Sequence, residues 1–319
     1  MNFCRRYELP ALLALVIITA SPSVSAQTDI PLQNLTPTGT LSGTLTLPAA
    51  VTRPDVIVIQ PGSGPVDRDG NMPGYRNNHL MMLATALAER GIATLRIDKR
   101  AIGESRAAGR DESKLRFETY VDDLSSWARL VARRQDMRRL FLAGHSQGAL
   151  IATLAAQNIK TSGIILLAPP AVPAGRLIAR QNDISGAAIP IKNKIREILG
   201  ALEFGNHYAN PPDNLRALFR PSIQPFLISW FRYDPAKELA KLRIAALVVQ
   251  GTTDLQVWAR DTSRLVTNGR NVVQVNVTGM NHILKIGPTD RRRNFATYNM
   301  PDLPLAPGLI DVIANFVHR

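Results

Sequence analysis

The sequence contains one cysteine, Cys4, so no thiol occurs anywhere from residue 27 onward. This absence excludes structural disulfides, thiolate metal sites and a cysteine nucleophile from residues 27–319, whatever the redox state of the compartment. Nucleophilic chemistry in that part of the chain must therefore rest on another type of side chain.

The N-terminal part of the chain also lacks an apolar run long enough to span a membrane. Residues 9–20 form an apolar stretch of about a dozen residues, too short for the roughly 20 that a membrane-spanning helix needs. Arg5 and Arg6 precede it and Val24-Ser25-Ala26 follows, which is typical of an export signal. We predict that residues 1–26 are a signal peptide and that the mature protein is periplasmic or secreted, without an integral membrane segment. An uncleaved anchor is the alternative.

The charge of the chain is strongly basic but dispersed. The formal net charge of +13 falls to +12 when Arg5, Arg6 and Glu8 are removed with the signal. Neither a basic stripe with interleaved aromatic residues nor a nucleic-acid-binding motif is present, so we expect no nucleic-acid partner. The charge is interpreted as an attraction to anionic envelope surfaces. The longest basic run, residues 291–293, is predicted to be a solvated loop.

Hydrophobic periodicity predicts an α/β chain. After a polar leader, residues 39–47 alternate apolar and polar side chains, the pattern of a half-exposed strand in an antiparallel edge hairpin. Apolar β-runs and amphipathic segments then alternate, which predicts a mostly parallel sheet with helices on both faces. The predicted strands are residues 56–59, 92–97, 140–143, 164–167, 244–250 and 272–277. The predicted helices are residues 79–90, 117–135, 149–157, 258–268 and 308–318.

One long segment interrupts this alternation. Residues 169–234 are rich in proline and too long for a structureless loop, so we predict a largely helical cap insertion within one domain, residues 27–319. Phe226 and Trp230 in this segment are candidates for lining a substrate pocket. The alternative is that such aromatic side chains only hold the cap to the body of the protein.

A Gly-x-Ser-x-Gly pentapeptide, Gly144-His145-Ser146-Gln147-Gly148, lies between a predicted strand and a predicted helix. In a nucleophile elbow, the two glycines allow the chain to turn sharply and to present a serine hydroxyl at the C-terminal edge of a sheet. Ser146 is therefore the candidate nucleophile.

A nucleophilic serine needs a base, and a carboxylate that orients the base. Among the five histidines, His282 alone follows a late predicted strand at the C-terminal edge of the sheet. Asp254 follows the preceding predicted strand, with Asp261 as a rival; a turn or helix-capping role is the alternative for Asp254. The other histidines lie in a predicted helix, in the pentapeptide, in the cap and near the C-terminus: His79, His145, His207 and His318.

The transition state of acyl transfer also needs hydrogen-bond donors for its oxyanion. We predict the backbone N–H of Gln147 as one donor and that of Ser63 as the second, with Gly62 or Gly64 as alternatives. A Gly-Pro turn is the simpler interpretation of this loop. A phosphate cradle would need the Lys-Ser/Thr ending of a P-loop, which the loop lacks.

Together these motifs resemble those of the serine α/β-hydrolases, in particular the exported bacterial esterases, over nearly the whole chain from about Gly39. The order Ser146, Asp254, His282 is that of α/β-hydrolases and differs from those of chymotrypsin and subtilisin. The resemblance implies an α/β-hydrolase fold and a cofactor-free, metal-free hydrolysis of small-molecule esters. The chain departs from many relatives at Gln60-Pro61, where His-Gly is common, and at Ala101-Ile102, where a small glycine is common.

Charged residues near the oxyanion loop are expected to hold that loop in shape. They are Asp67, Arg68, Asp69 and the segment Asp98-Lys99-Arg100. Direct binding of an anionic substrate by Arg68 or Arg100 is the alternative.

The sequence thus predicts a carboxylic-ester hydrolase. A dehalogenase or an epoxide hydrolase on this fold would need an aspartate in place of Ser146. A thioesterase or an acyltransferase would use the same constellation, and a non-catalytic binding protein on a hydrolase fold is a remote alternative.

Overall fold

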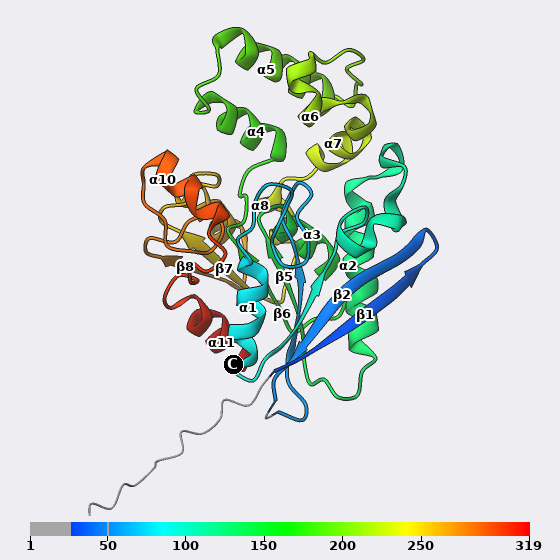
Figure 1. The fold of residues 1–319 in the computed structure, drawn as a ribbon, viewed down its shortest axis with the longest axis vertical. Coiled ribbons are helices and arrows are strands. Elements are labelled where there is room, and N and C mark those ends of the chain that lie inside the picture. The colour runs from blue at the N-terminus through cyan, green and yellow to red at the C-terminus, as the bar shows by residue number, and fades with distance from the viewer. Residues whose placement is uncertain (1–26, 50) are drawn as a thin grey trace, which may run out of the picture.

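A mixed sheet of eight strands runs through the computed structural model, which describes residues 27–49 and 51–319 (Figure 1). The spatial order is β1-β2-β4-β3-β5-β6-β7-β8. β3 to β8 are parallel to one another, whereas β1 and β2 form an antiparallel edge hairpin and β2 pairs antiparallel with β4. The strands are β1 (Thr28–Thr36), β2 (Gly39–Leu47), β3 (Val56–Gln60), β4 (Ala93–Ile97), β5 (Leu140–His145), β6 (Gly163–Leu167), β7 (Ala245–Gly251) and β8 (Val272–Val277). The predicted α/β class is confirmed.

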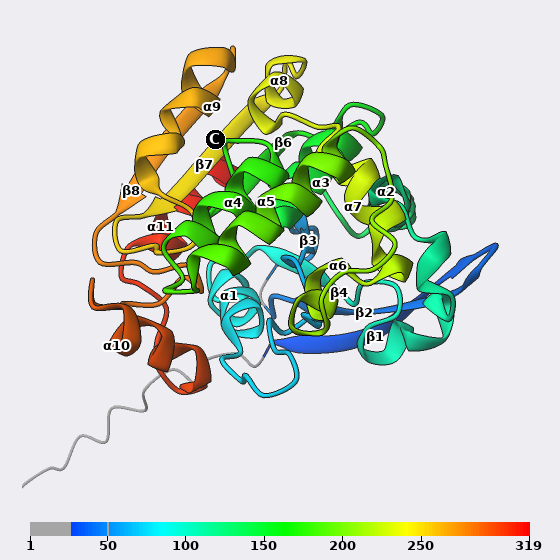
Figure 2. The same cartoon turned by 90° about the horizontal axis from the view of Figure 1, so that it is seen from above.

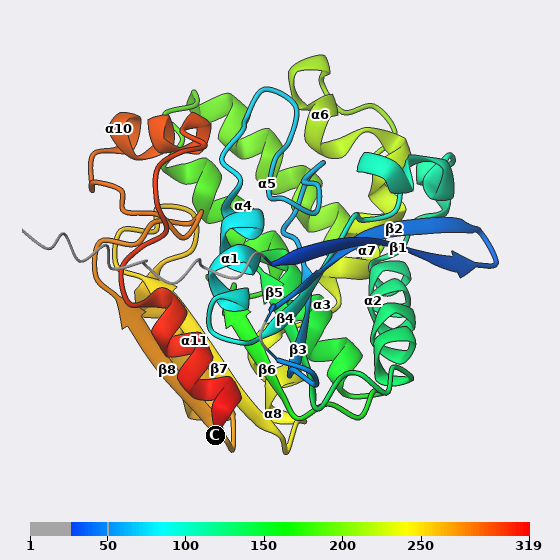
Figure 3. The same cartoon turned by 60° about the horizontal axis from the view of Figure 1, so that its bottom comes forward.

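The central strands are apolar because both of their faces are covered. Every residue of β3, β4, β5 and β6 is buried, as expected of parallel strands between two helical layers. One face packs against α1 (His79–Ala88) and α11 (Leu309–His318). The other packs against α2 (Phe117–Ala132), α3 (Gln147–Ala156), α8 (Pro235–Ala240) and α9 (Ser263–Asn268), on the opposite side in Figure 3.

The segment between β6 and α8 forms a separate helical layer. It contains α4 (Ala174–Asp183), α5 (Ile189–Glu203), α6 (Arg216–Phe219) and α7 (Gln224–Phe231). These helices lie above the sheet in Figure 1 and cover its centre when the molecule is seen from above in Figure 2. Residues 169–234 are thus largely helical, as predicted for a cap.

Several local predictions differ from the structure. The leader before residue 39 is a full strand, β1, which pairs with β2 along its whole length. Residues 291–293 begin a short helix, α10 (Arg291–Ala296), because the Asp290 side chain accepts from the Arg293 N–H at 2.9 Å. The run is solvent-exposed, as predicted, but it forms a helix where a loop was expected. The single helix predicted at residues 258–268 is instead a 3₁₀ turn followed by α9.

The remaining described elements are short 3₁₀ turns: Gly103–Gly109, Glu112–Lys114, Asp213–Leu215, Pro221–Ile223, Ala259–Asp261 and Thr297–Asn299. No helix among residues 27–49 and 51–319 has the length and apolarity needed to cross a membrane. The predicted signal peptide, residues 1–26, lies outside the described residues.

Candidate active site

Ser146 occupies the sharp turn between β5 and α3. Its backbone has φ 54° and ψ −121°, a conformation that side chains other than glycine rarely adopt. The Ser146 N–H donates to the Leu167 carbonyl of β6 at 2.8 Å, which fixes the turn against the sheet. The side chain thus lies at the C-terminal edge of the parallel strands, as predicted for a nucleophile elbow.

The two elbow glycines provide space, and their φ angles are not positive. A Cβ atom on Gly144 would overlap the Gly148 carbonyl, and a Cβ atom on Gly148 would overlap the carbonyls of Gln60 and Pro61. The strain of the turn falls on Ser146 itself. The two glycines thus allow the sharp turn, as predicted, by leaving room for the neighbouring backbone, while the positive φ is that of Ser146.

His282 and Asp254 are hydrogen-bonded to each other. The His282 Nδ1–H donates to Asp254 Oδ2 at 2.8 Å, and both side chains are almost fully buried. Asp254 Oδ1 accepts the backbone N–H groups of Gln256 and Val257 at 2.8 and 2.9 Å. These bonds fix the carboxylate, which in turn holds the imidazole with Nε2 available to accept a proton. The rival Asp261 is paired with Arg180 of α4 at 2.7 Å.

Gln250 is a supporting residue that the sequence reasoning missed. It is the penultimate residue of β7 and is fully buried. Its Nε2 donates to Asp254 Oδ2 at 3.2 Å and to the Val257 carbonyl at 2.9 Å. A polar residue in an otherwise apolar strand, four positions before the candidate aspartate, was the available signal.

His145 links the elbow to the loop that carries His282. Its Nε2–H donates to the His282 backbone carbonyl at 2.7 Å, and the two rings are 4.9 Å apart. Burial, and then the proximity of His282, lower the pKa of His145 to about 3, so the ring is neutral. The sequence analysis treated His145 only as the variable residue of the pentapeptide.

His79 extends this row of imidazoles. Its ring lies 4.8 Å from that of His145, edge to face, and its Nδ1 bonds Asn77 Oδ1 at 2.5 Å. Burial lowers the pKa of His79 well below its ordinary value, so this ring is neutral as well. His318 lies on the surface, where its Nε2 bonds the Arg90 carbonyl at 3.1 Å.

The predicted oxyanion donors lie next to Ser146. Within the described residues, neither the Ser63 N–H nor the Gln147 N–H donates to a protein acceptor. A Cβ atom built on Gly62 would come within 3.3 Å of the Ser146 Cβ, so the loop after β3 lies directly against the elbow. This arrangement leaves two backbone donors free to bind a developing negative charge.

The charged network predicted behind this loop is present. Arg68 pairs with Asp98 and with Glu104, each at 2.6 Å. Arg100 pairs with Asp123 at 2.5 Å, and both are buried. Because Arg68 and Arg100 each have a carboxylate partner, the structure favours a structural role for them over binding of an anionic substrate.

Phe226 and Trp230 belong to α7, and their side chains pack against α2. The Trp230 ring stacks on Phe117 with centroids 5.8 Å apart and an interplanar angle of 6°. Phe226 meets the Tyr120 ring edge to face at 5.5 Å. Both side chains are buried among aromatic residues, which favours the interpretation that they hold the cap to the body.

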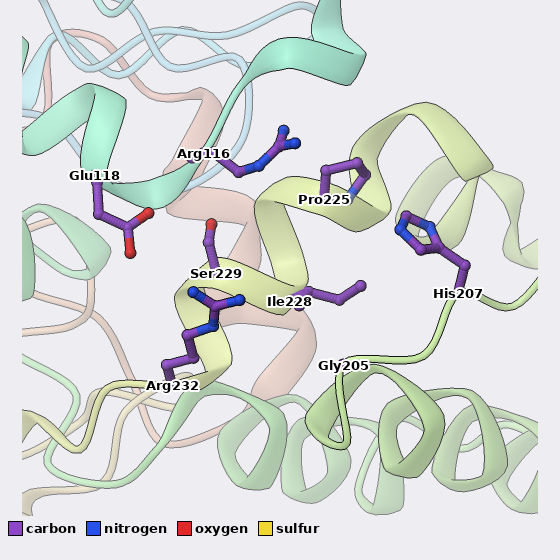
Figure 4. Close-up of a pocket in the computed structure, with 8 residues that line it drawn as sticks. All are labelled: Arg116, Glu118, Gly205, His207, Pro225, Ile228, Ser229 and Arg232. Atoms are coloured by element: carbon purple, nitrogen blue, oxygen red, sulfur yellow. The ribbon is translucent and has the colours of Figure 1, made fainter.

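Two of the surface hollows in the described part of the chain bear on the predicted residues. The smaller, of about 360 Å³, lies between α2, α7 and the loop after α5 (Figure 4). It is lined by Arg116, Glu118, Gly205, His207, Pro225, Ile228, Ser229 and Arg232. It contains His207 but none of Ser146, Asp254 and His282.

The larger hollow, of about 630 Å³, adjoins the oxyanion loop at Pro65. It is lined by Pro65, Asp67, Asn71, Met72, Pro73, Gly74, Tyr75, Arg76, Ala101, Ile102, Gly103, Arg106 and Asn299. No group of three or more His, Cys, Asp and Glu side chains in the described ranges could hold a metal ion.

The chain is similar in sequence to known hydrolases. The sequence model of the family described as "Serine aminopeptidase, S33" matches residues 77–211. Esterase EstD of Thermotoga maritima is 28% identical over 235 residues, which are 72% of this chain and 55% of EstD. The chain therefore spans about half the length of this curated relative.

Solved structures share the fold. Est1E from Butyrivibrio proteoclasticus, solved with bound ferulic acid, has a TM-score of 0.59 and 16% identity, covering 90% of this chain and 96% of Est1E. The α/β hydrolase GrgF from Penicillium sp. has a TM-score of 0.55 and 19% identity, covering 81% of this chain and 91% of GrgF. The predicted α/β-hydrolase fold is confirmed.

Proposed function

We propose that this chain, a member of the serine α/β-hydrolase superfamily, hydrolyses carboxylic esters through an acyl-enzyme intermediate on Ser146. The observation that carries the proposal is the strained Ser146 turn at the same sheet edge as the hydrogen-bonded pair His282 and Asp254. The esterase name of EstD supports the same assignment.

In this mechanism, His282 Nε2 takes the proton of the Ser146 hydroxyl while Oγ attacks the ester carbonyl carbon. The Ser63 and Gln147 N–H groups bind the negative charge on the carbonyl oxygen. The tetrahedral intermediate collapses, and the leaving alcohol takes the proton from His282. Water then attacks the acyl-enzyme by the same steps and releases the acid. Asp254 keeps the imidazole in place and stabilises its charged form throughout.

An aminopeptidase would need an acidic group to bind the free amino terminus of its substrate. The hollow beside the oxyanion loop instead contains two exposed arginines, Arg76 and Arg106. Its carboxylate, Asp67, accepts the backbone N–H groups of Asp69 and Asn71, both at 2.9 Å. None of Ser146, Asp254 and His282 lines this hollow, so the choice of an ester over an N-terminal peptide rests on the esterase relative EstD.

The test is a substrate panel on the purified protein. Nitrophenyl esters of graded acyl length, matched thioesters and aminoacyl amides are compared by kcat/KM, with Ser146→Ala as the control. We expect the esters to be turned over fastest and the Ser146→Ala protein to be inactive on all of them. Preferred hydrolysis of thioesters or amides by the wild type would contradict the ester assignment.

We also propose that the protein is exported. The proposal rests on the N-terminal pattern, Arg5 and Arg6 before an apolar stretch that ends at Val24-Ser25-Ala26. Cell fractionation followed by N-terminal sequencing tests it. We expect protein outside the cytoplasm that begins at Gln27, whereas intact protein in the cytoplasm would contradict export.

A further inference from the structure

Lys99 is a buried lysine that has no carboxylate partner among the described residues. It follows β4 and is 4% exposed. Its neighbours Asp98 and Arg100 both form ion pairs, with Arg68 and Asp123. A buried charge without a counter-ion is costly, so its retention at this place calls for a compensating contact.

Backbone carbonyls of the oxyanion loop supply that contact. Lys99 Nζ donates to the Gly62 carbonyl and, at 2.5 Å, to the Gly64 carbonyl. Both carbonyls belong to the loop that follows β3. One ammonium group therefore bonds this loop on either side of Ser63.

The Gly62 carbonyl belongs to the same peptide unit as the Ser63 N–H. The peptide is planar, and no cis peptide occurs in the described chain, so the two groups point in opposite directions. With the carbonyl bonded to Lys99, the Ser63 N–H is directed away from Lys99. Gly62 itself lies against the Cβ of Ser146.

The charge of Lys99 also reaches the elbow. It is among the causes that lower the pKa of His145, the residue before Ser146. Burial lowers the pKa of Lys99 itself to about 7. A neutral amine retains two N–H donors, so both carbonyl bonds can persist in either protonation state.

We propose that Lys99 is the positioning residue of the oxyanion hole: it holds the Gly62–Ser63 peptide so that the Ser63 N–H points to the oxyanion formed on Ser146. The proposal rests on the proposed function, because it assumes nucleophilic attack by Ser146. Lys99 acts through the loop and does not touch the substrate.

The chain contains a matched control. Lys285 is also buried, and its Nζ also donates to two backbone carbonyls, those of Met300 at 2.7 Å and Pro301 at 3.2 Å. These carbonyls lie outside the oxyanion loop. Replacing either lysine by methionine removes one buried ammonium and two carbonyl bonds, but only Lys99→Met releases the Ser63 peptide.

The experiment compares a trifluoromethyl ketone with its matched secondary alcohol as ligands of the full-length protein. Ser146 Oγ adds to the ketone carbon and its proton passes to His282, which gives a bound hemiketal oxyanion. The alcohol reports ground-state binding alone. We expect Lys99→Met to weaken binding of the ketone by about 10²-fold, since loss of an oxyanion donor lowers kcat by about 10²–10³-fold. Alcohol binding should change less than about threefold, and Lys285→Met should leave the ketone-to-alcohol ratio unchanged.

A double-mutant cycle supplies the second readout. Ser63→Pro removes the N–H that Lys99 is proposed to orient. If Lys99 acts through that group, Lys99→Met in the Ser63→Pro background should reduce kcat no further. Additive losses, or equal weakening of ketone and alcohol by Lys99→Met, would overturn the proposal. Should Lys99→Met fail to fold, Lys99→Leu, which also lacks a donor, replaces it in both measurements.

The ligand assay distinguishes a failure of the Lys99 proposal from a failure of the esterase assignment. A wild type that binds the ketone at Ser146 but hydrolyses no ester would contradict the esterase assignment, and the effect of Lys99→Met would still decide the role of Lys99. A wild type that does not bind the ketone covalently at Ser146 would overturn both.

Discussion

His145 donates from Nε2 to the backbone carbonyl of His282 at 2.7 Å, so the residue before the candidate nucleophile is bonded to the candidate base. This bond ties the loop after β8 to the elbow between β5 and α3. The relative position of Ser146 and His282 therefore depends on a neutral imidazole that does not itself take part in proton transfer.

The first prediction tests this link. His145→Phe keeps a ring of similar shape but removes the donor, and we expect kcat to fall by about 10- to 100-fold, because small misplacements of a catalytic group are costly. His318→Phe is the matched control, since His318 also bonds a backbone carbonyl, that of Arg90. Steady-state kinetics on one nitrophenyl ester measures both. An equal, small effect of the two substitutions would refute the positioning role.

The second prediction concerns Ser146. A fluorophosphonate probe should label the wild type once and leave Ser146→Ala unlabelled. Ser146→Gly should also be unlabelled but more stable than Ser146→Ala by about 1–3 kcal/mol, because glycine tolerates a φ of 54°. Mass spectrometry locates the label and urea unfolding gives the stability. Labelling of either variant elsewhere would remove Ser146 from its role.

The third prediction separates the candidate base from a bystander. His282→Ala should reduce kcat by several powers of ten, as expected for a triad member. His207→Ala should stay within about tenfold, because His207 lines a hollow that contains none of the three candidate residues. If His207→Ala were as damaging as His282→Ala, the assignment of the base would have to change.

The fourth prediction concerns the cap. Trp230→Ala should destabilise the protein by about 3–5 kcal/mol, since it removes a buried ring that stacks on Phe117. The ratio of kcat/KM between short and long acyl esters should stay constant. Thermal unfolding and a chain-length series measure the two effects. A change of about 10-fold in that ratio would instead support a role for Trp230 in the acyl pocket.

The fifth prediction concerns pH. The pKa of Lys99 is about 7 in the folded protein, whereas an unfolded lysine titrates near 10.4. Between these values the unfolded chain binds more protons, so this group makes stability rise with pH from about 7 to 10. Wild type should therefore gain unfolding free energy relative to Lys99→Met over that range, as measured by urea unfolding. Burial also lowers the pKa of Lys285, to about 8. Because Lys285 is present in both proteins, its contribution to the unfolding free energy cancels in the comparison.

Local sequence was sufficient for much of the fold. The strands of the parallel part of the sheet are covered on both faces, and such strands can be recognised in the sequence as short apolar runs. The chain order of Ser146, Asp254 and His282 follows from the strands that precede them. Boundaries were less accurate: the helix predicted from residue 149 starts at Gln147, directly after the elbow. β1 was interpreted as a polar leader, because Ile30, Leu32 and Leu35 are its only large apolar residues; in the structure it is the first strand of the predicted hairpin.

What the sequence by itself determined is the strand–helix alternation, the elbow and the candidate nucleophile, carboxylate and base, since each depends on residues close together along the chain. Only the tertiary structure decided that His145 is bonded to His282, that Gln250 supports Asp254, and that Trp230 packs on Phe117. It alone also decided that Lys99 is bonded to the oxyanion loop and not to a carboxylate. The physical reason is that these contacts join segments that are separate in sequence, or depend on side-chain directions that packing fixes, so no local pattern specifies them.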